Sequence, residues 1–201
     1  MSSTLSPKRL FRRRSTGILQ KWLESEGAQI VELAVTLPLL TAMFVGTYDF
    51  GQAFNLRQKL IAATREGARF AANQTTADLN SATATTPASI IAIRNVIDSY
   101  LQAAKVTECR LPATAGPPTD WSWTFTTTGC SGGNFTLTIN RGFPLGQVVV
   151  GSGPVTVEGT QVRMSYPYQW QFNRVVQLLV PGSTYAPATQ IQISAVVQNL
   201  N

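Results

Sequence analysis

The most prominent feature of the hydrophobic pattern is an uncharged run from Leu33 to Tyr48. Its apolar character extends back to Gly27, with Glu32 as the only charge inside it. About 20 helical residues cross a hydrocarbon core of about 30 Å, and residues 27–48 supply that length. A carboxylate at membrane depth costs roughly 2.5–3.5 kcal/mol on insertion scales unless it is paired or protonated. The pattern therefore predicts one membrane-spanning helix that contains a functional acid.

Helical periodicity continues beyond the apolar run. Small or apolar residues recur at spacings of 4, 3, 4 and 3 and form one narrow stripe: Leu56, Leu60, Ala63, Gly67 and Phe70. The opposite side carries the charged residues Arg57, Lys59, Arg65 and Glu66. This arrangement predicts that the anchor continues as an amphipathic helix to about Asn73. Pro38 has no N–H to donate, so a kink or a locally melted turn is expected near Leu37.

A polar segment, residues 73–86, predicts a loop before a second helix. Thr86 and Pro87 fit an N-cap followed by proline at the first helical position. One apolar face then continues to a helix end near Lys105, and its members are Ile90, Ile93, Ile97, Leu101 and Ala104.

The second half of the chain has the alternation that is typical of β-strands. Strands are predicted at residues 121–125, 135–139, 155–166 and 190–198, with a glycine-rich turn at 129–133. A short helix is predicted at 172–180, ended by Pro181 and Gly182. The order of the elements predicts an α+β fold. In this fold the long N-terminal helix packs on a small domain with a second helix and an antiparallel sheet.

Positive charge is concentrated near the N-terminus. The 201-residue chain has a net charge of +6, and six basic and two acidic residues before Gly27 contribute +4 of it. The positive-inside rule then predicts a cytoplasmic N-terminus and an exported chain after Asp49. The remainder, at +2, offers no basic face, so no nucleic-acid partner is expected. The expected organisation is a basic cytoplasmic leader (1–27), a transmembrane and amphipathic helix (28–73) and an exported α+β domain (74–201).

The chain contains no histidine and two cysteines, Cys109 and Cys130. The absence of histidine excludes histidine-dependent triads and histidine-ligated metal sites. The scattered acids show no motif spacing: Asp98, Glu108, Asp120 and Glu158. We therefore expect no catalysis, no metal and no cofactor. Export permits a Cys109–Cys130 disulfide, which would contribute about 3 kcal/mol by closing about 20 residues, and two buried free thiols are the alternative.

Two aromatic rows occur in the predicted strands. Trp121, Trp123 and Phe125 share one face of a strand, and a second row alternates around Pro167: Tyr166, Tyr168, Trp170 and Phe172. Such a row is either the packed face of a sheet or a platform for carbohydrate. Proline cannot donate to a strand ladder, so Pro167 is expected at a sheet edge or a strand end.

Three segments resemble a known family. The sequence EGAQIVELAVTLPLL is followed by Asp49-Phe50-Gly51 and by AATREGARFAA at residues 62–72. Together they resemble TadE-like proteins of bacterial pilus assembly over about residues 25–72. The resemblance implies a pilin-like protein of tight-adherence (Flp) pili in the bacterial inner membrane. It also implies cleavage by a prepilin peptidase on the cytoplasmic side, after a glycine.

Carried onto this sequence, the family's cleavage site falls between Gly27 and Ala28. Glu32 becomes the fifth residue of the mature chain, and Leu33 stands where the family more often has an aromatic residue. A glycine before the cut allows close approach of the backbone to a protease. Glu32 is then expected to pair with the new α-amine of Ala28 on a neighbouring subunit, and the alternative is a hydrated position at the cytoplasmic interface.

The same helix is expected to pack against other pilin-like subunits through Glu32, Pro38, Gly46 and Gly51, with Ala34 and Ala42 as further small residues. A secretory signal cut near Gly51-Gln52-Ala53 is a rival interpretation of the apolar run. The expected function is that of a minor pilin-like protein needed for pilus assembly, with a membrane-tethered adhesin or carbohydrate-binding module as the alternative.

Overall fold

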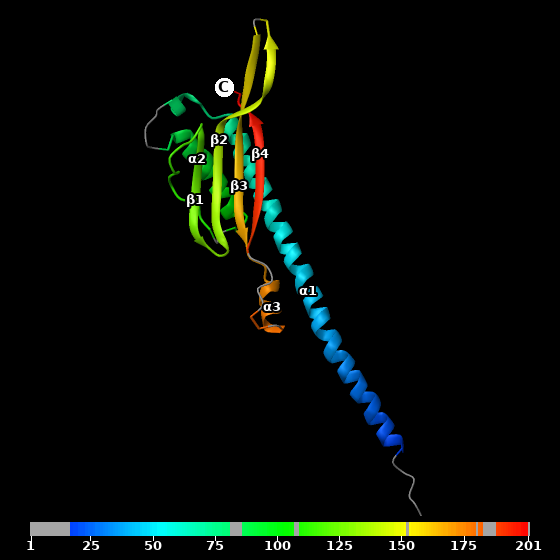
Figure 1. The fold of residues 1–201 in the computed structure, drawn as a ribbon. Coiled ribbons are helices and arrows are strands. Elements are labelled where there is room, and N and C mark those ends of the chain that lie inside the picture. The colour runs from blue at the N-terminus through cyan, green and yellow to red at the C-terminus, as the bar shows by residue number, and fades with distance from the viewer. Residues whose placement is uncertain are drawn as a thin grey trace, which may run out of the picture. The chain divides into compact units, whose positions relative to one another are not determined.

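The computed structural model describes residues 17–80, 86–106, 109–151, 153–179, 181–182 and 188–200. The chain divides into two compact units, Met1–Phe44 and Val45–Asn201. The α+β fold class is confirmed. The structure has a long N-terminal apolar helix, a further helix and a four-stranded antiparallel sheet (Figure 1).

The long helix, α1, spans Gly17–Ala72 and begins earlier than the expected start at Ala28. The residues between Gly17 and Gly27 contain no proline and are mostly good helix formers, so the helix propagates through them. It also continues through Pro38 without a melted turn. The leader expected at residues 1–27 thus includes helical backbone, and residues 1–16 lie outside the described residues.

The sheet is an antiparallel meander in the order β1-β2-β3-β4. Its strands are β1 (Ser122–Cys130), β2 (Gly133–Val150), β3 (Gly153–Tyr168) and β4 (Thr189–Gln198). The predicted glycine-rich turn joins β1 to β2, where Cys130 pairs with Gly133. Gly132 and Gly133 have φ values of 96° and 136°, a region that favours glycine.

Strands β2 and β3 are longer than expected. Sheet pairing with β1 ends at Asn140 and pairing with β4 ends at Gly159, yet the β2–β3 pairing continues from Phe143 to Val150. Figure 1 shows this two-stranded extension rising beyond the other strands. Glycines and Pro144 interrupt the sequence alternation here, and register shifts at the same place show bulges that absorb them.

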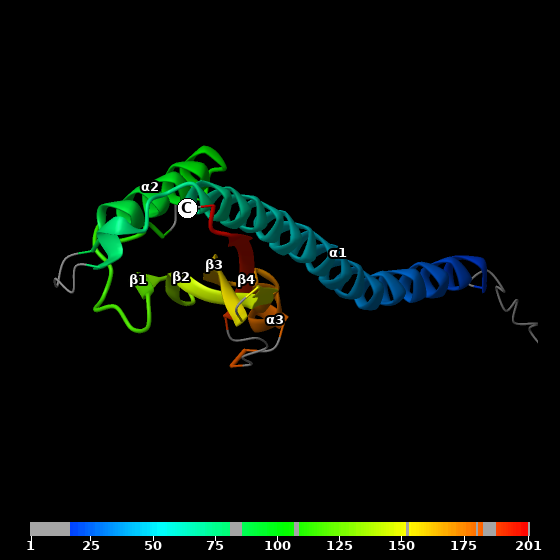
Figure 2. The same cartoon turned by 90° about the horizontal axis from the view of Figure 1, so that it is seen from above.

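The hydrophobic core of the second unit lies between the sheet and two helices. α1 after residue 44 and α2 (Ala88–Ala103) cover one face of the sheet (Figure 2). Strand residues alternate between this core and a polar face, on which Thr124 and Thr138 lie 3.1 Å apart through their hydroxyl oxygens. The predicted stripe of α1 is confirmed, because Leu60, Ala63 and Gly67 are buried.

Gly67 allows α1 and α2 to approach closely. A Cβ at this position would overlap Ile97 of α2, whose Cδ1 would lie 2.6 Å away. Because Ile97 is fully buried, it has little room to move. The glycine is thus required by packing.

The start of α2 differs from the expectation. Thr86 does not cap it; its hydroxyl instead accepts a hydrogen bond from the Ala115 N–H at 3.1 Å. The Asp78 carboxylate, from the short 3-10 helix η1 (Ala77–Asn80), accepts the Ser89 N–H at 2.8 Å and the Ser89 hydroxyl at 3.0 Å. An acid from a neighbouring element therefore satisfies an N–H of the first turn.

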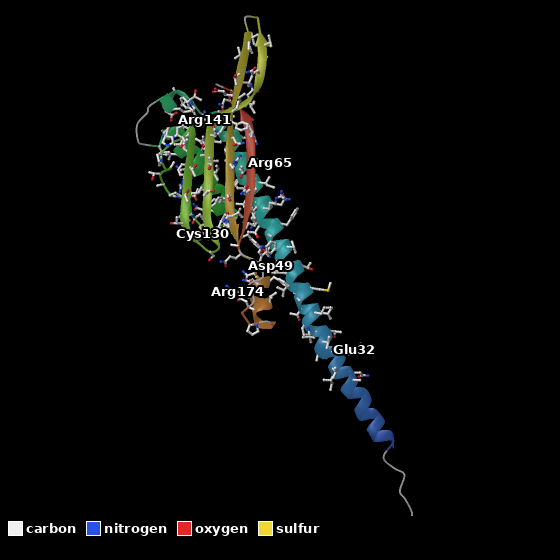
Figure 3. The ribbon with its side chains drawn as sticks, viewed as in Figure 1. Glu32, Asp49, Arg65, Cys130, Arg141 and Arg174 are labelled. Carbon is white, nitrogen blue, oxygen red and sulfur yellow. A yellow bond between two sulfur atoms is a disulfide. The ribbon has the colours of Figure 1, made fainter. Side chains whose placement is uncertain are left out.

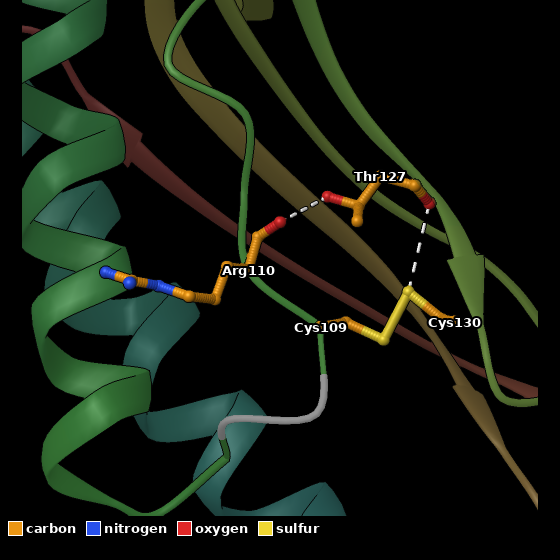
Figure 4. The surroundings of a disulfide bond; sticks show 4 residues. All are labelled: Cys109, Arg110, Thr127 and Cys130. Carbon is orange, nitrogen blue, oxygen red and sulfur yellow. Dashed lines mark hydrogen bonds between the residues drawn. A yellow bond between two sulfur atoms is a disulfide. The ribbon is translucent and has the colours of Figure 1, made fainter.

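A disulfide joins Cys109 to Cys130, with the two Cα atoms 5.7 Å apart (Figure 4). The Thr127 hydroxyl donates a hydrogen bond to the Arg110 carbonyl at 2.6 Å, which holds the same loop against β1. The predicted bridge is confirmed, and the alternative of two free thiols is excluded for these cysteines.

Candidate functional site

Between Gly27 and Phe44, α1 exposes nearly all of its apolar side chains. The described helix from Gly27 to Ala72 contains a window that is apolar and long enough to cross a membrane, and none of that window is buried. Exposure reaches 75% at Phe44. A soluble core helix would bury this surface, so the exposure supports the predicted membrane span.

The predicted cleavage bond lies inside this helix. Gly27 and Ala28 are both helical and exposed, and nothing lies within 4 Å of the position a Gly27 Cβ would take. Cleavage after Gly27 stays a prediction, and a protease that binds an extended segment would first have to open the helix here. Glycine lowers the cost of that opening because it destabilises a helix by about 1 kcal/mol relative to alanine.

Glu32 and Leu33, the other two residues of the expected processing site, are exposed on the same helix (Figure 3 labels Glu32). The carbonyl of Glu32 accepts a hydrogen bond from the Thr36 hydroxyl at 2.9 Å. The pairing of the Glu32 carboxylate with an α-amine of a neighbouring subunit stays a prediction.

Of the residues expected at a subunit contact, Gly46 and Gly51 leave open surface on α1. A Cβ at either position would have nothing within 4 Å. Pro38 is half-buried, and Thr41, one turn beyond Leu37, donates its hydroxyl to the Leu37 carbonyl at 2.8 Å. Close approach by another helix is sterically possible at both glycines.

Asp49, directly after the apolar run, is a buried acid whose role the sequence did not reveal. It is only 1% exposed, and its carboxylate accepts the Phe172 N–H at 2.5 Å. Phe172 is the first residue of α3 (Phe172–Leu179), so Asp49 of α1 satisfies the N-terminus of α3, beside which Figure 3 shows it. A carboxylate is favourable there because the helix dipole is positive at this end.

Tyr168 joins the same contact. Its hydroxyl donates to the Asp49 carbonyl at 3.1 Å, and Asp49 Oδ1 lies 3.5 Å away. Burial, with the nearby charge of Asp49, raises the pKa of Tyr168 to about 12. Trp170 stacks edge-to-face on both Tyr168 and Phe50, with ring centroids 5.1 and 5.2 Å apart. These contacts tie the end of β3 and the start of α3 to α1.

Arg141 of β2 holds the other end of α1. It is 2% exposed, and its guanidinium donates to the carbonyl oxygens of Ala71 and, at 2.7 Å, of Gln74. Burial lowers the pKa of Arg141, and the charge of Asp78 opposes that shift. A cation at a helix C-terminus satisfies carbonyls that have no partner within the helix. A lone arginine between Asn140 and Gly142 carried no signal of this role in the sequence.

The first aromatic row is largely packed. Trp123 and Phe125 are 4% and 0% exposed and belong to the core. Trp121, which precedes β1 at a φ of 60°, is 49% exposed and does not share that face. Pro167 lies one residue before the end of β3, where the strand still pairs with β4 but its pairing with β2 has ended at Ser165, so the expectation of a sheet edge or a strand end is confirmed.

The exposed apolar part of α1 and most of its buried part after residue 44 belong to one segment that matches a known protein family. Residues 27–69 match the family model of TadE-like proteins. The resemblance predicted from the sequence is therefore confirmed for this segment. The TadE-like segment begins at Gly27, contains Glu32 and Asp49, and includes Gly67 at the crossing with α2. No match was found among curated proteins or among solved structures.

Proposed function

We propose that this protein is a minor pilin-like component needed for the assembly of Tad pili. The observation that carries the proposal is the overlap of the TadE-like match with an apolar helix whose side chains are exposed. A TadE-like segment associates the chain with Tad pilus assembly, and the exposed helix supplies the surface that membrane insertion and subunit packing both need.

In this proposal the basic residues before Gly27 stay in the cytoplasm and the unit from Val45 onward is exported. A prepilin peptidase cuts after Gly27, where the TadE-like match begins. The cut releases the charged leader and creates an α-amine at Ala28, one helical turn from Glu32. The carboxylate of one subunit and the amine of a neighbour then offset each other's burial in lipid. The protein acts by packing, and we propose no catalytic role for it.

Processing can be tested by mass spectrometry of the N-terminus of the protein isolated from membranes. The wild-type chain should begin at Ala28. Gly27→Val should abolish this product, because a branched side chain blocks close approach of the backbone and is not tolerated beside the cut. Gly46→Val, the same change further along the same helix, should leave trimming unchanged.

Two results would contradict the proposal. A mature chain that begins at Met1 would show that no trimming occurs. A mature chain that begins at residues 52–55 would show instead the cut of a secretory signal peptidase.

A further inference from the structure

The second unit contains a cavity of about 780 Å³ close to the end of the apolar run. Six residues of α1 line it, among them Val45 and Leu56. The four polar ones lie at spacings of 4, 3 and 4 and share one helix face: Tyr48, Gln52, Asn55 and Lys59. The other walls come from Lys105 just after α2, Ser131 in the β1–β2 turn, the end of β3 and the first turn of α3.

The lining is strongly basic. The described residues around the cavity include three cations, Lys59, Lys105 and Arg174, and no carboxylate. None of these three side chains forms an ion pair within the described part of the chain. Asp49 is a neighbouring anion, but it does not line the cavity and its buried carboxylate is directed to the Phe172 N–H. Three cations with no carboxylate in the described lining create a positive potential in the cavity that an anion would relieve.

Lys105 is held in an uncommon backbone conformation. Its φ is 59°, in the left-handed region that non-glycine residues seldom adopt. Its N–H donates to the Gln102 carbonyl at 2.9 Å, which fixes the residue at the end of α2. Together with the Val106 N–H, which donates to the Leu101 carbonyl at 2.8 Å, this bond forms the Schellman motif that ends α2 and fixes Lys105 beside the cavity.

The cavity lies at the depth where the chain leaves the apolar run. Tyr48 is the last residue of that run, and Gln52 and Asn55 follow one and two turns later. Side chains on a helix lean toward its N-terminus, so the Lys59 ammonium is directed back toward Asn55 and the membrane. Tyrosine, amides and basic residues at this position suit the polar layer of a bilayer.

We propose that this cavity binds the phosphate of an anionic phospholipid headgroup. Arg174 and the two lysines contact the phosphate, and the amides of Gln52 and Asn55 hydrogen-bond the hydroxyls of a glycerol headgroup. The inference rests on the proposed membrane anchorage, but it does not depend on cleavage after Gly27 or on pilus assembly.

The test uses the full chain in detergent micelles that contain phosphatidylglycerol or phosphatidylcholine, with retained lipid counted by native mass spectrometry. Phosphatidylglycerol should be retained in preference to phosphatidylcholine. Lys59→Gln, Lys105→Gln and Arg174→Gln should each lower the affinity for phosphatidylglycerol about fivefold, since each removes one cation next to an anionic headgroup.

Arg57→Gln provides the matched control. Arg57 is an exposed cation on α1 and does not line this cavity, so its loss should change the affinity by less than about twofold. Equal retention of the two lipids, or an equal effect of Arg57→Gln, would overturn the proposal.

sn-Glycerol 3-phosphate tests a soluble source of the same chemical group. It should bind at least about 100-fold more weakly than phosphatidylglycerol, because it gains nothing from the bilayer. Equal binding would overturn the assignment to a lipid.

Flotation with vesicles separates the proposed membrane anchorage from the proposed binding of an anionic headgroup. A chain that fails to float contradicts the anchorage itself, whereas a chain that floats without a lipid preference contradicts only the cavity's ligand.

Discussion

Single buried side chains hold both ends of α1 after residue 44. Asp49 binds the first N–H of α3, and Arg141 binds the carbonyls of Ala71, in the last turn of α1, and of Gln74, just after it. Both groups are charged and almost fully buried, so each depends on its partners to offset desolvation. The removal of either side chain would take a buried hydrogen-bond partner away from the backbone.

Arg141→Met should destabilise the protein by about 1–3 kcal/mol. The methionine fills similar space but removes the buried, charge-assisted hydrogen bonds to the carbonyls of Ala71 and Gln74. Arg163→Met is the control, because Arg163 is an exposed arginine in the middle of β3, and it should stay within about 0.5 kcal/mol. Chemical denaturation in detergent measures both variants, and equal stability of the two would contradict the role of Arg141.

Tyr168 should make stability fall at high pH. Its pKa is raised from an ordinary value of 10.0 to about 12, so ionisation costs more free energy in the folded than in the unfolded state. The stabilisation is present in full below about pH 10 and is lost as the pH rises through about 12. The melting temperature of the wild type should therefore fall more steeply over this range than that of Tyr168→Phe. Parallel curves would show that Tyr168 does not contribute.

At the scale of elements, the crossing of α1 with α2 depends on the absence of a side chain at Gly67. The stripe that contains Gly67 was visible in the sequence as an apolar periodicity. The periodicity could not show that Gly67, rather than Ala63 or Phe70, marks the closest approach, because that depends on the path of α2. The structure places Ile97 directly over the glycine.

Gly67→Ala should destabilise the protein although alanine is the better helix former. Overpacking against Ile97 costs about 1–3 kcal/mol, which exceeds the gain in helix propensity of about 1 kcal/mol. Gly51→Ala, on the same helix but with open space around it, should raise stability by up to about 1 kcal/mol. Thermal unfolding of both variants should give shifts of opposite sign, and two stabilising shifts would contradict the close crossing.

Local patterns predicted the helices, the turn at residues 129–133 and parts of all four strands. They failed where distant residues decide the structure. The extension of β2 and β3 forms despite Pro144 because the two segments pair with each other across bulges. Asp78 replaces the expected Thr86 at the start of α2. The buried contacts of Asp49 and Arg141 join residues more than 60 positions apart, a separation that no periodicity records.

At the scale of the whole molecule, the chain combines an exposed apolar helix with an α+β unit closed by a disulfide. The TadE-like match, residues 27–69, lies within α1, so the sheet lies outside the matched segment. The helix was recognisable from sequence because charge and hydropathy are local properties. The cavity lined by Lys59, Lys105 and Arg174 could not be recognised from the sequence, because its cations come from three separate segments of the chain.

Glu32→Ala tests the proposed role of the acid in assembly. The variant should insert into the membrane at least as well as the wild type, because a charge at membrane depth has been removed. It should nevertheless fail to support surface pili, because the α-amine of a neighbouring Ala28 would be buried without a partner. Glu66→Ala removes an exposed acid that pairs only with Arg69 in the described structure, and it should leave pili intact. Electron microscopy of whole cells gives the readout, and normal pili with Glu32→Ala would refute the pairing.

The reach of Arg141 back to the carbonyl of Ala71 has a consequence for how the protein is made. The two residues are 70 positions apart, so in the proposed export Ala71 would leave the translocation channel long before its partner does. During that interval the nearby Gln74 N–H would be the donor that the chain itself offers to the Ala71 carbonyl. Closure of so long a loop also costs conformational entropy, which favours late docking. If the chain is exported as proposed, the helix and the sheet would reach their final arrangement only after most of it has crossed the membrane.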